Sequence, residues 1–383
     1  MDFELSEEQR ILQNMIRKFL EKEIAPLVEE YEHQKKPLTK EIIKKLEPFG
    51  YTKAIVPEER GGLGLDFVSN SIMIEEVSRV WSSLRALSNV SSHVAHVIAS
   101  RGTKEQRERF LPGLFSIDQL ACFALTEPNV GSDASAVETK AQRDGDHYVI
   151  NGSKSLITGG SMADVVCLFA TVDRSKKAKG VTAFLISKDE SEFGARDTPK
   201  MGMHSSVLSE LSFEDCRVPA ENRLGEEGEG LRIAFGELNI GRVAETFSAV
   251  GIAQAALEAA IRYAKERIQF GKPIGSFQLV QEMIVDMSLK VYTARLLGYR
   301  AAELLNNGVE CRRETSFAKL FSTEAMIDVT NKAIQVHGGY GYTQEFPVER
   351  YYRDGRQMAL AEGTTEIQKL IVGRDILGIS ALI

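Results

Sequence analysis

Cysteine is scarce in this chain, and its spacing excludes sites that need paired cysteines. The four cysteines are widely separated: Cys122, Cys167, Cys216 and Cys311. Because no CxxC pair occurs, neither a zinc site of that type nor a disulfide scaffold is indicated. His93 and His96 lie three residues apart, but no third ligand accompanies them. We therefore expect no bound metal.

Long apolar runs and an excess of basic residues are also missing. The N-terminus, Met1-Asp2-Phe3-Glu4-Leu5, has no basic segment followed by an apolar one, so we expect no signal peptide and no membrane span. A cytoplasmic protein fits, as does an organelle matrix protein whose transit peptide was removed. The net charge of −7 argues against nucleic acid as a partner. With 43% hydrophobic and 26% charged residues, the chain is typical of soluble globular proteins.

The common nucleotide and hydrolase motifs are absent. No GxxxxGK[ST], HExxH or GxSxG segment occurs. The glycine clusters at 61–64 and 338–341 lack the GxGxxG spacing after a strand, which excludes an ordinary Rossmann dinucleotide site.

The pattern of the chain changes twice, which predicts three regions. Residues 1–118 show helical spacing, residues 119–226 show strand patterns, and residues 227–383 are helical again. The 383 residues are too many for one ordinary core. Because strands and helices do not alternate, a doubly wound sheet is not expected.

Individual elements follow from local signals. Ser6 and Gln9 form a capping-box pattern ahead of the first helix, and another helix is predicted near 40–46. Asp144-Gly145 and Asn151-Gly152 each predict a tight turn between strands. The predicted strands are 139–143, 147–150, 153–158, 165–172, 181–187 and 208–218, and the long C-terminal helices are 249–267 and 278–305.

Four segments carry candidate chemistry. They are 123–133, with small, hydroxylated and glycine residues after a strand; 266–274, which ends a long helix; the glycine-rich 335–342; and 361–367, where Glu362 precedes a Gly-Thr-Thr loop. Each alone is equally compatible with an ordinary turn or cap. Composition cannot select Glu362 over the other carboxylates.

Together these segments resemble the acyl-CoA dehydrogenase family over essentially the whole chain, and they are most similar to its glutaryl-CoA and alicyclic acyl-CoA branch. The resemblance also covers 57–64, 150–154 and 350–354. It implies a mainly α protein with an N-terminal helical domain (1–118), a middle β-barrel domain (119–226) and a C-terminal four-helix bundle (227–383).

The resemblance implies bound FAD. It places Glu362 as the base that removes the α-proton of an acyl-CoA thioester while the β-hydrogen leaves as hydride to flavin N5. It implies a homotetramer built as a dimer of dimers, and an electron-transferring flavoprotein as acceptor. The implied cofactor residues are Phe123, Leu125, Thr126, Gly131, Ser132, Ile157, Thr158, Arg267, Gln269, Phe270, Phe277, Gln278, Gln335, Val336, Gly338, Gly339, Thr364 and Glu366. The implied substrate residues are Ser132, Asn239, Arg242, Gly363 and Arg85.

Three positions depart from the usual family pattern. Ala361 stands where many members have Tyr, Leu156 where many have Trp, and Asn239 where several have Asp. The first two changes remove aromatic volume and favour a compact alicyclic or branched acyl group. Arg85 instead suggests a dicarboxylic acyl group, as in glutaryl-CoA enzymes, and an Arg on the helix surface or in a structural ion pair is an equal alternative.

Other functions stay open at this point. They are dehydrogenation of an acyl-carrier-protein thioester, enoyl reduction, and a non-enzymatic scaffold of the same fold. A basic rim at the coenzyme A entrance and activity on free CoA esters would favour the CoA enzyme over a carrier-protein enzyme. The acyl group, the electron acceptor, the direction of the reaction and the pathway do not follow from the sequence.

Overall fold

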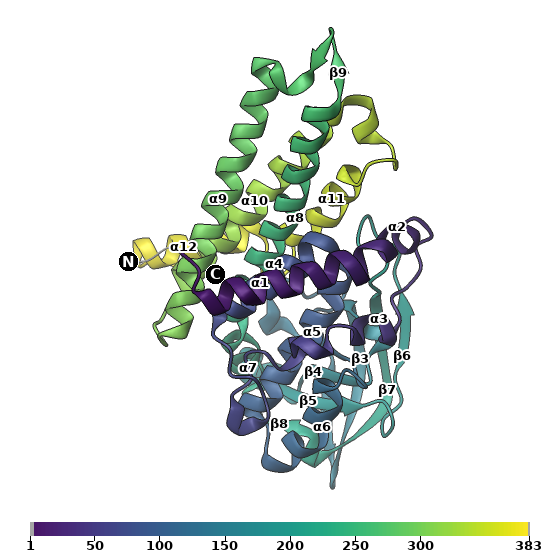
Figure 1. The fold of residues 1–383 in the computed structure, drawn as a ribbon. Helices are drawn as coiled ribbons and strands as arrows, with labels where there is room; N and C mark the ends of the chain where they lie inside the picture. Colours follow the sequence, from purple (N-terminus) through teal and green to yellow (C-terminus); the bar gives the residue numbers. More distant parts are fainter. Residues whose placement is uncertain (1–3, 382–383) are drawn as a thin grey trace.

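The computed structural model describes residues 4–381 and shows a helical, a sheet and a second helical region in that order (Figure 1). This order confirms the predicted architecture. At the start of α1, Ser6 N donates to Gln9 Oε1 at 3.0 Å and Gln9 N donates to Ser6 Oγ at 3.2 Å, which completes the predicted capping box. The N-terminal helices are α1 (Glu7–Phe19), α2 (Ala25–His33), α3 (Lys40–Lys44), α4 (Phe67–Val80), α5 (Ser82–Arg101) and α6 (Lys104–Phe115).

The middle region forms one eight-stranded sheet. Its order is β6-β7-β3-β2-β4-β5-β8, and β1 pairs with β4 in parallel. The predicted turn between β2 and β3 is present, offset by one residue: β2 runs through Asp144, and Gly145 and Asp146 form the turn. The strands are β1 (Ala121–Ala124), β2 (Lys140–Asp144), β3 (His147–Thr158), β4 (Val165–Thr171), β5 (Val181–Ser187), β6 (Gly194–Asp197), β7 (Leu208–Pro219) and β8 (Arg223–Leu224).

The second predicted turn, Asn151-Gly152, is wrong. β3 continues through it, and the pairing with β7 shifts register between Ile150 and Gly152. Asn151 accepts a hydrogen bond from Asp215 N of β7 at 2.8 Å, and Gly152 has φ +149°. A Cβ on Gly152 would lie 2.7 Å from Thr139 Cα. The Asn-Gly pair therefore forms a bulge within β3, where glycine allows the neighbouring backbone to approach closely.

Apart from α7, which packs beside β5, the C-terminal helices stand above the sheet region in Figure 1, with the short hairpin of β9 (Ile268–Gln269) and β10 (Lys272–Pro273) at their far end. The longest, α8, begins at Leu238, eleven residues before the predicted start at residue 249. The helices are α7 (Gly230–Gly236), α8 (Leu238–Glu266), α9 (Gln278–Asn306), α10 (Arg312–His337), α11 (Val348–Gly355) and α12 (Thr365–Leu377).

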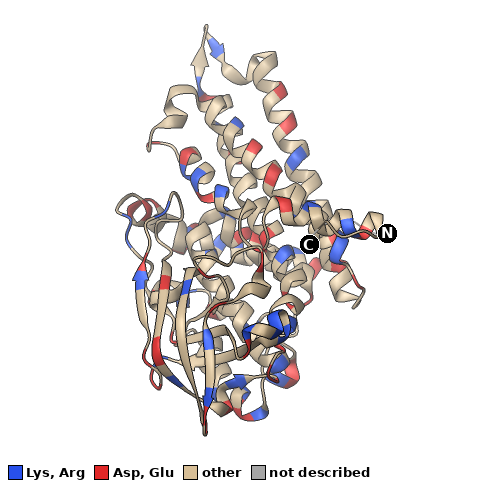
Figure 2. Cartoon of the chain, turned by 180° about the vertical axis from the view of Figure 1, so that it is seen from behind, with Lys and Arg blue, Asp and Glu red and all other residues tan. Residues whose placement is uncertain are grey.

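The core joins the regions rather than separating them. Trp81 and Leu84 of the N-terminal region share one buried apolar cluster with Phe247 of α8. A second cluster packs α5 and α6 against the sheet. Lys and Arg are interspersed with Asp and Glu along all regions (Figure 2). Among residues 4–381, no helix is long and apolar enough to span a bilayer.

Candidate active site

Glu362 lies in a strained loop just before α12. Its φ is +53°, and that of Gly363 is +86°. A non-glycine residue in this left-handed region is uncommon and requires support from its surroundings. Thr364 ends the loop by accepting a hydrogen bond from Ile367 N at 3.3 Å, and thus caps α12.

Two side chains hold the carbonyls of this loop. Lys319 of α10 donates from Nζ to Gly363 O at 2.8 Å. Gln368 of α12 donates from Nε2 to Glu362 O and to Gly363 O, both at 3.0 Å. Neither residue was among the predicted site residues. No motif marks Lys319, because its role depends on how α10 packs beside the loop.

The Glu362 carboxylate is directed at a glycine of α8. A Cβ on Gly241 would lie 3.0 Å from Glu362 Oε2 and 3.7 Å from His93 Cε1. Any larger residue at 241 would displace the carboxylate. The His93 ring in turn stacks on Phe123, with centroids 5.4 Å apart. Glu362, His93 and Phe123 thus come together from three distant parts of the chain.

The surroundings of Glu362 shift the pKa of its carboxyl group. Burial raises the pKa of its carboxyl above the ordinary value. The charges of Arg242 and Lys319 lower that pKa, and the negative charge of Glu245 raises it. The result is a stronger base than an exposed glutamate.

Arg242 and Asn239 lie beside each other on the first turns of α8. Arg242 donates from Nη1 to Asn239 Oδ1 at 3.0 Å, and Thr315 donates to the same oxygen at 3.1 Å. Arg242 is 4% exposed. Within residues 4–381 its Nε has no hydrogen-bond partner, so a buried cation with a donor to spare lies near Glu362. Such a group suits a polar or anionic ligand.

The 123–133 segment is anchored by a buried ion pair. Lys154 of β3 lies 2.7 Å from Glu127 and also donates to Leu125 O at 2.9 Å. Lys154 is fully buried, so the pair fixes the loop at the sheet edge. Gly131 is exposed, and in the part of the chain that the structure describes no atom lies within 4 Å of a Cβ placed there. The rigid base and open tip fit a loop that approaches a planar cofactor closely.

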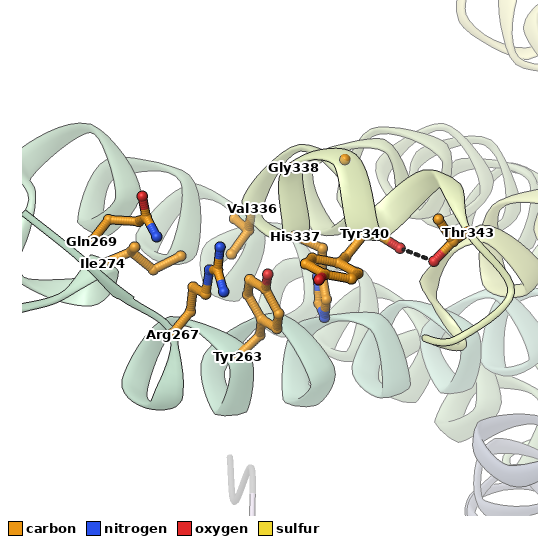
Figure 3. Close-up of a pocket in the computed structure, with 10 residues that line it drawn as sticks. Tyr263, Arg267, Gln269, Ile274, Val336, His337, Gly338, Tyr340 and Thr343 are labelled. Carbon is orange, nitrogen blue, oxygen red and sulfur yellow. Dashed lines mark hydrogen bonds between the residues drawn. The ribbon is translucent and has the colours of Figure 1, made fainter.

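The second group of predicted cofactor residues lines a cavity of about 520 Å³ at the far end of α8 (Figure 3). Arg267 lies over the Tyr340 ring, 5.7 Å from its centroid. Gln269, Val336, Gly338 and Gly339 share this cavity. Among residues 4–381 Arg267 has no salt-bridge partner, and an arginine without a carboxylate partner beside two glycines fits a phosphate group. The other predicted residues near this end are Phe270 and Phe277, whose rings meet edge to face at 5.9 Å, and the exposed Gln278 and Gln335.

The two groups of cofactor residues are not brought together within one chain. Gly241, near Glu362, and Arg267 are separated by 26 residues along α8. At 1.5 Å per residue this is roughly 39 Å, which exceeds the span of one FAD molecule. The 123–133 loop lies with the first group, because Phe123 stacks on His93 beside Glu362. Ser155 N donates to Thr126 O at 3.0 Å, which holds the end of β3 that carries Ile157 and Thr158 against that loop. Thr364 and Glu366 follow Glu362 directly in the sequence.

Arg85 is held by a protein carboxylate. Its Nη1 lies 2.8 Å from Glu245 Oε1 of α8, and its Nη2 lies 3.2 Å from Met358 Sδ. The structural ion pair considered from the sequence therefore exists. Glu245 was not among the predicted site residues, because nothing in its local sequence marks a buried carboxylate.

Known proteins match the chain over its whole length. Sequence profiles match at residues 6–118 (Acyl-CoA dehydrogenase, N-terminal domain), 122–216 (middle domain) and 228–377 (C-terminal domain). A "short-chain specific" acyl-CoA dehydrogenase of Clostridium acetobutylicum is 40% identical, covering 98% of this chain and 100% of that protein. A glutaryl-CoA dehydrogenase of Desulfococcus multivorans is 38% identical, covering 99% of each.

Solved structures of acyl-CoA dehydrogenases also match the fold of this chain. Butyryl-CoA dehydrogenase from Megasphaera elsdenii matches with a TM-score of 0.95 and 38% identity, covering 98% of this chain and 100% of that one. The relatives include both short-chain and glutaryl-CoA enzymes, so the branch within the family is not fixed. The chain therefore belongs to the acyl-CoA dehydrogenase family of FAD-dependent oxidoreductases.

Proposed function

We propose that this protein oxidises an acyl-CoA thioester between Cα and Cβ with Glu362 as the base. The observation that supports this most directly is the Glu362 carboxylate, held against Gly241 by a loop whose carbonyls are fixed by Lys319 and Gln368. Its raised pKa suits removal of a weakly acidic α-proton. FAD, when bound, supplies the hydride acceptor for the Cβ hydrogen.

The other site residues bind and orient in this proposal. The backbone N–H of Glu362 is suited to donate to the thioester carbonyl, which stabilises negative charge as the proton leaves. Arg242 with Asn239, and Ser132 on the open loop, contact the coenzyme A portion. The test is anaerobic addition of straight, branched, alicyclic and dicarboxylic acyl-CoAs to the FAD-loaded protein. Loss of flavin absorbance with any of them supports the function, and no change with all of them contradicts it.

We propose a compact alicyclic or branched acyl group as substrate. Ala361 precedes the base, and Leu156 has φ +57° and is 62% exposed next to the predicted flavin segment of β3. Both are smaller than the aromatic rings common at these positions, which leaves width near the reacting carbons. Ala361→Tyr should suppress turnover of cyclohexanecarboxyl-CoA and spare that of butyryl-CoA. Wild-type preference for straight chains of eight or more carbons would contradict the proposal.

We propose that the active protein is a homotetramer, built as a dimer of dimers. The roughly 39 Å between the two groups of cofactor residues is explained if each FAD lies between two subunits. Val285, Leu289 and Tyr292 form an exposed apolar stripe on α9, as expected of a subunit contact. Sedimentation of the flavin-loaded protein should give a tetramer, and a flavin-saturated monomer would contradict this.

We propose an electron-transferring flavoprotein as the electron acceptor. The test is to mix this protein with a purified electron-transferring flavoprotein and to measure whether acyl-CoA then drives reduction of a dye.

A further inference from the structure

A polar cluster is buried one helical turn beyond the carboxylate of Glu362. It consists of Tyr51, Arg85, Ser88 and Glu245, whose exposed fractions are 1%, 3%, 0% and 6%. Arg85 and Glu245 form its ion pair at 2.8 Å. Tyr51 packs in the same buried cluster as Leu84, the residue before Arg85, and Ser88 lies about one turn after Arg85 on α5. The charges of Arg85 and Glu245 both act on the Tyr51 hydroxyl, whose pKa is raised chiefly by burial.

The cluster has hydrogen-bonding capacity left over. Across residues 4–381, Arg85 Nε, Glu245 Oε2, Tyr51 Oη and Ser88 Oγ have no hydrogen-bond partner. Buried donors and acceptors are normally paired, because leaving them unpaired is costly. Arg85 Nη2 faces only the Met358 sulfur at 3.2 Å, a weak acceptor. Donors and acceptors are therefore presented together, while the two charges cancel.

The position of the cluster relative to Glu362 follows from two elements. Glu245 is four residues after Gly241 on α8, so it lies roughly 6 Å farther along the helix. Met358, which contacts Arg85, is four residues before Glu362. Asn239 lies two residues before Gly241 on α8, and the guanidinium of Arg242 reaches back to it, with Nη1 3.0 Å from Asn239 Oδ1. An acyl-CoA whose coenzyme A end lies by Asn239 and this guanidinium, and whose Cα lies at Glu362, would extend its acyl chain toward the cluster. About four bonds, counted from Cα to a heteroatom at the end of the chain, reach hydrogen-bonding distance of Glu245.

We propose that the cluster of Tyr51, Arg85, Ser88 and Glu245 binds a neutral hydrogen-bonding group, a hydroxyl or an amide, at the far end of a short acyl chain. This proposal rests on the proposed acyl-CoA function, and it adds a distal neutral polar group to the compact acyl group proposed above. A hydroxyl can accept from Arg85 Nε and donate to Glu245 Oε2. A carboxylate would add a second buried anion beside Glu245, with only one cation to balance both, so the site should reject it.

The test uses acyl-CoAs of equal length with the FAD-loaded protein. Pentanoyl-, 5-hydroxypentanoyl-, glutaramyl- and glutaryl-CoA differ only at the distal group. We expect kcat/KM for the hydroxyl or amide compound to exceed that for pentanoyl-CoA and for glutaryl-CoA by at least about tenfold. Equal values, or a preference for pentanoyl- or glutaryl-CoA, would overturn the proposal.

Glu245→Gln tests why the carboxylate is rejected. The amide keeps the shape but frees the charge of Arg85, so glutaryl-CoA should improve relative to 5-hydroxypentanoyl-CoA by about tenfold or more. An unchanged ratio would overturn the assignment. The matched control is Glu75→Gln, which makes the same change in the buried Glu75–Arg295 pair (2.7 Å) of α4 and α9 and should leave the ratio unchanged. If Glu245→Gln does not fold, the double variant Arg85→Met, Glu245→Leu replaces both charges. It should prefer pentanoyl-CoA, and a retained preference for the hydroxyl compound would overturn the proposal.

Calorimetric titration of the same four thioesters separates this proposal from the reaction itself. If no thioester reduces the flavin but the hydroxyl or amide compound binds most tightly, the proposed reaction fails and the cluster assignment holds. If the flavin is reduced without that preference, the reaction holds and the assignment fails. If none of the four binds, both fail.

Discussion

At the scale of single residues, Glu362 combines an unfavourable backbone with a defined position. A non-glycine residue at φ +53° carries a conformational cost of about 1–3 kcal/mol. The loop tolerates this because Lys319 and Gln368 fix its carbonyls and Thr364 starts α12 directly after it. The strain places the carboxylate against Gly241, where a Cβ would lie 3.0 Å from Oε2 and would shift the carboxylate. The surrounding structure thus stabilises a geometry that the local sequence disfavours.

Glu362→Gln tests the proposed base. The amide has nearly the same shape and keeps the loop contacts, which involve the backbone carbonyl rather than the side chain. It cannot accept a proton, so we expect FAD content and thioester binding to persist while the rate of flavin reduction falls at least about a hundredfold. Stopped-flow reduction with excess substrate measures this. Near-normal reduction would assign the base to another carboxylate.

Arg242→Gln tests the electrostatics around the base. Glu362 must be ionised to accept the α-proton, so the reduction rate should fall as pH drops through its raised pKa. Arg242 opposes that rise, and its removal should shift the rate profile to higher pH. The single-turnover rate, measured from pH 5 to 9 at saturating substrate, reports the shift. A profile that stays in place or moves to lower pH would contradict the assignment.

At the scale of elements, the sequence predicts what is local. Three local predictions are confirmed: the two end residues of β5, the turn after Asp144 and the cap at Ser6. Each of them depends on residues that are neighbours in the sequence. Asn151-Gly152 has the same local signal as Asp144-Gly145, yet it is a bulge because β7 pairs along β3. Local composition does not carry such tertiary context.

The residues of the candidate site also differ in how far the sequence predicts them. Only resemblance to a known family selects Glu362 or Arg267. The partners that hold the site in place act across large sequence separations: Lys319 reaches Gly363, and Glu245 reaches Arg85. These contacts depend on helix packing, which the periodicity of a single helix does not specify.

The buried pair Lys154–Glu127 is predicted to control the loop at the end of β1. Lys154→Met leaves the Glu127 carboxylate buried without its cation and removes the donor to Leu125 O. We expect a loss of about 3–5 kcal/mol in unfolding free energy. FAD binding should weaken as well. Urea unfolding and flavin retention during gel filtration measure the two effects. Adding Glu127→Gln should recover part of the stability, and full stability of the single variant would contradict the prediction.

At the scale of the whole molecule, two carboxylates join all three regions. Glu32 of α2 accepts from Trp81 Nε1 at 2.7 Å and from His204 N at 2.9 Å, the latter in the loop before β7. Asp354 of α11 accepts from Met203 N in the same loop. The N-terminal, middle and C-terminal regions therefore meet at one buried acidic site.

The two carboxylates differ in protonation. Burial alone would raise the pKa of Glu32, but hydrogen bonds from Ser83 and Trp81, together with the charge of Arg350, outweigh it, so the pKa lies below the usual range. Burial and the negative charge of Glu32 together raise the pKa of Asp354 to about 7. Near neutral pH one carboxylate is ionised and the other holds a proton for part of the time.

Asp354 should make the protein less stable as pH rises. In the unfolded chain an aspartate loses its proton near pH 3.9, whereas in the folded protein Asp354 keeps it up to about pH 7. Between these values the folded state binds more protons, so the contribution of Asp354 to the unfolding free energy falls with rising pH and is fully lost above pH 7.

Asp354→Asn tests this dependence, because the amide cannot ionise and its oxygen can still accept from Met203 N. The stability of the variant relative to wild type should therefore grow by about 1–3 kcal/mol between pH 5 and pH 8, as measured by urea unfolding. Glu32→Gln is the control of opposite sign, because it loses an ionised acceptor and should be destabilised at pH 8. An Asp354→Asn protein whose stability relative to wild type falls between pH 5 and pH 8 would mean that the ionised form of Asp354, and not the protonated one, holds the three regions together.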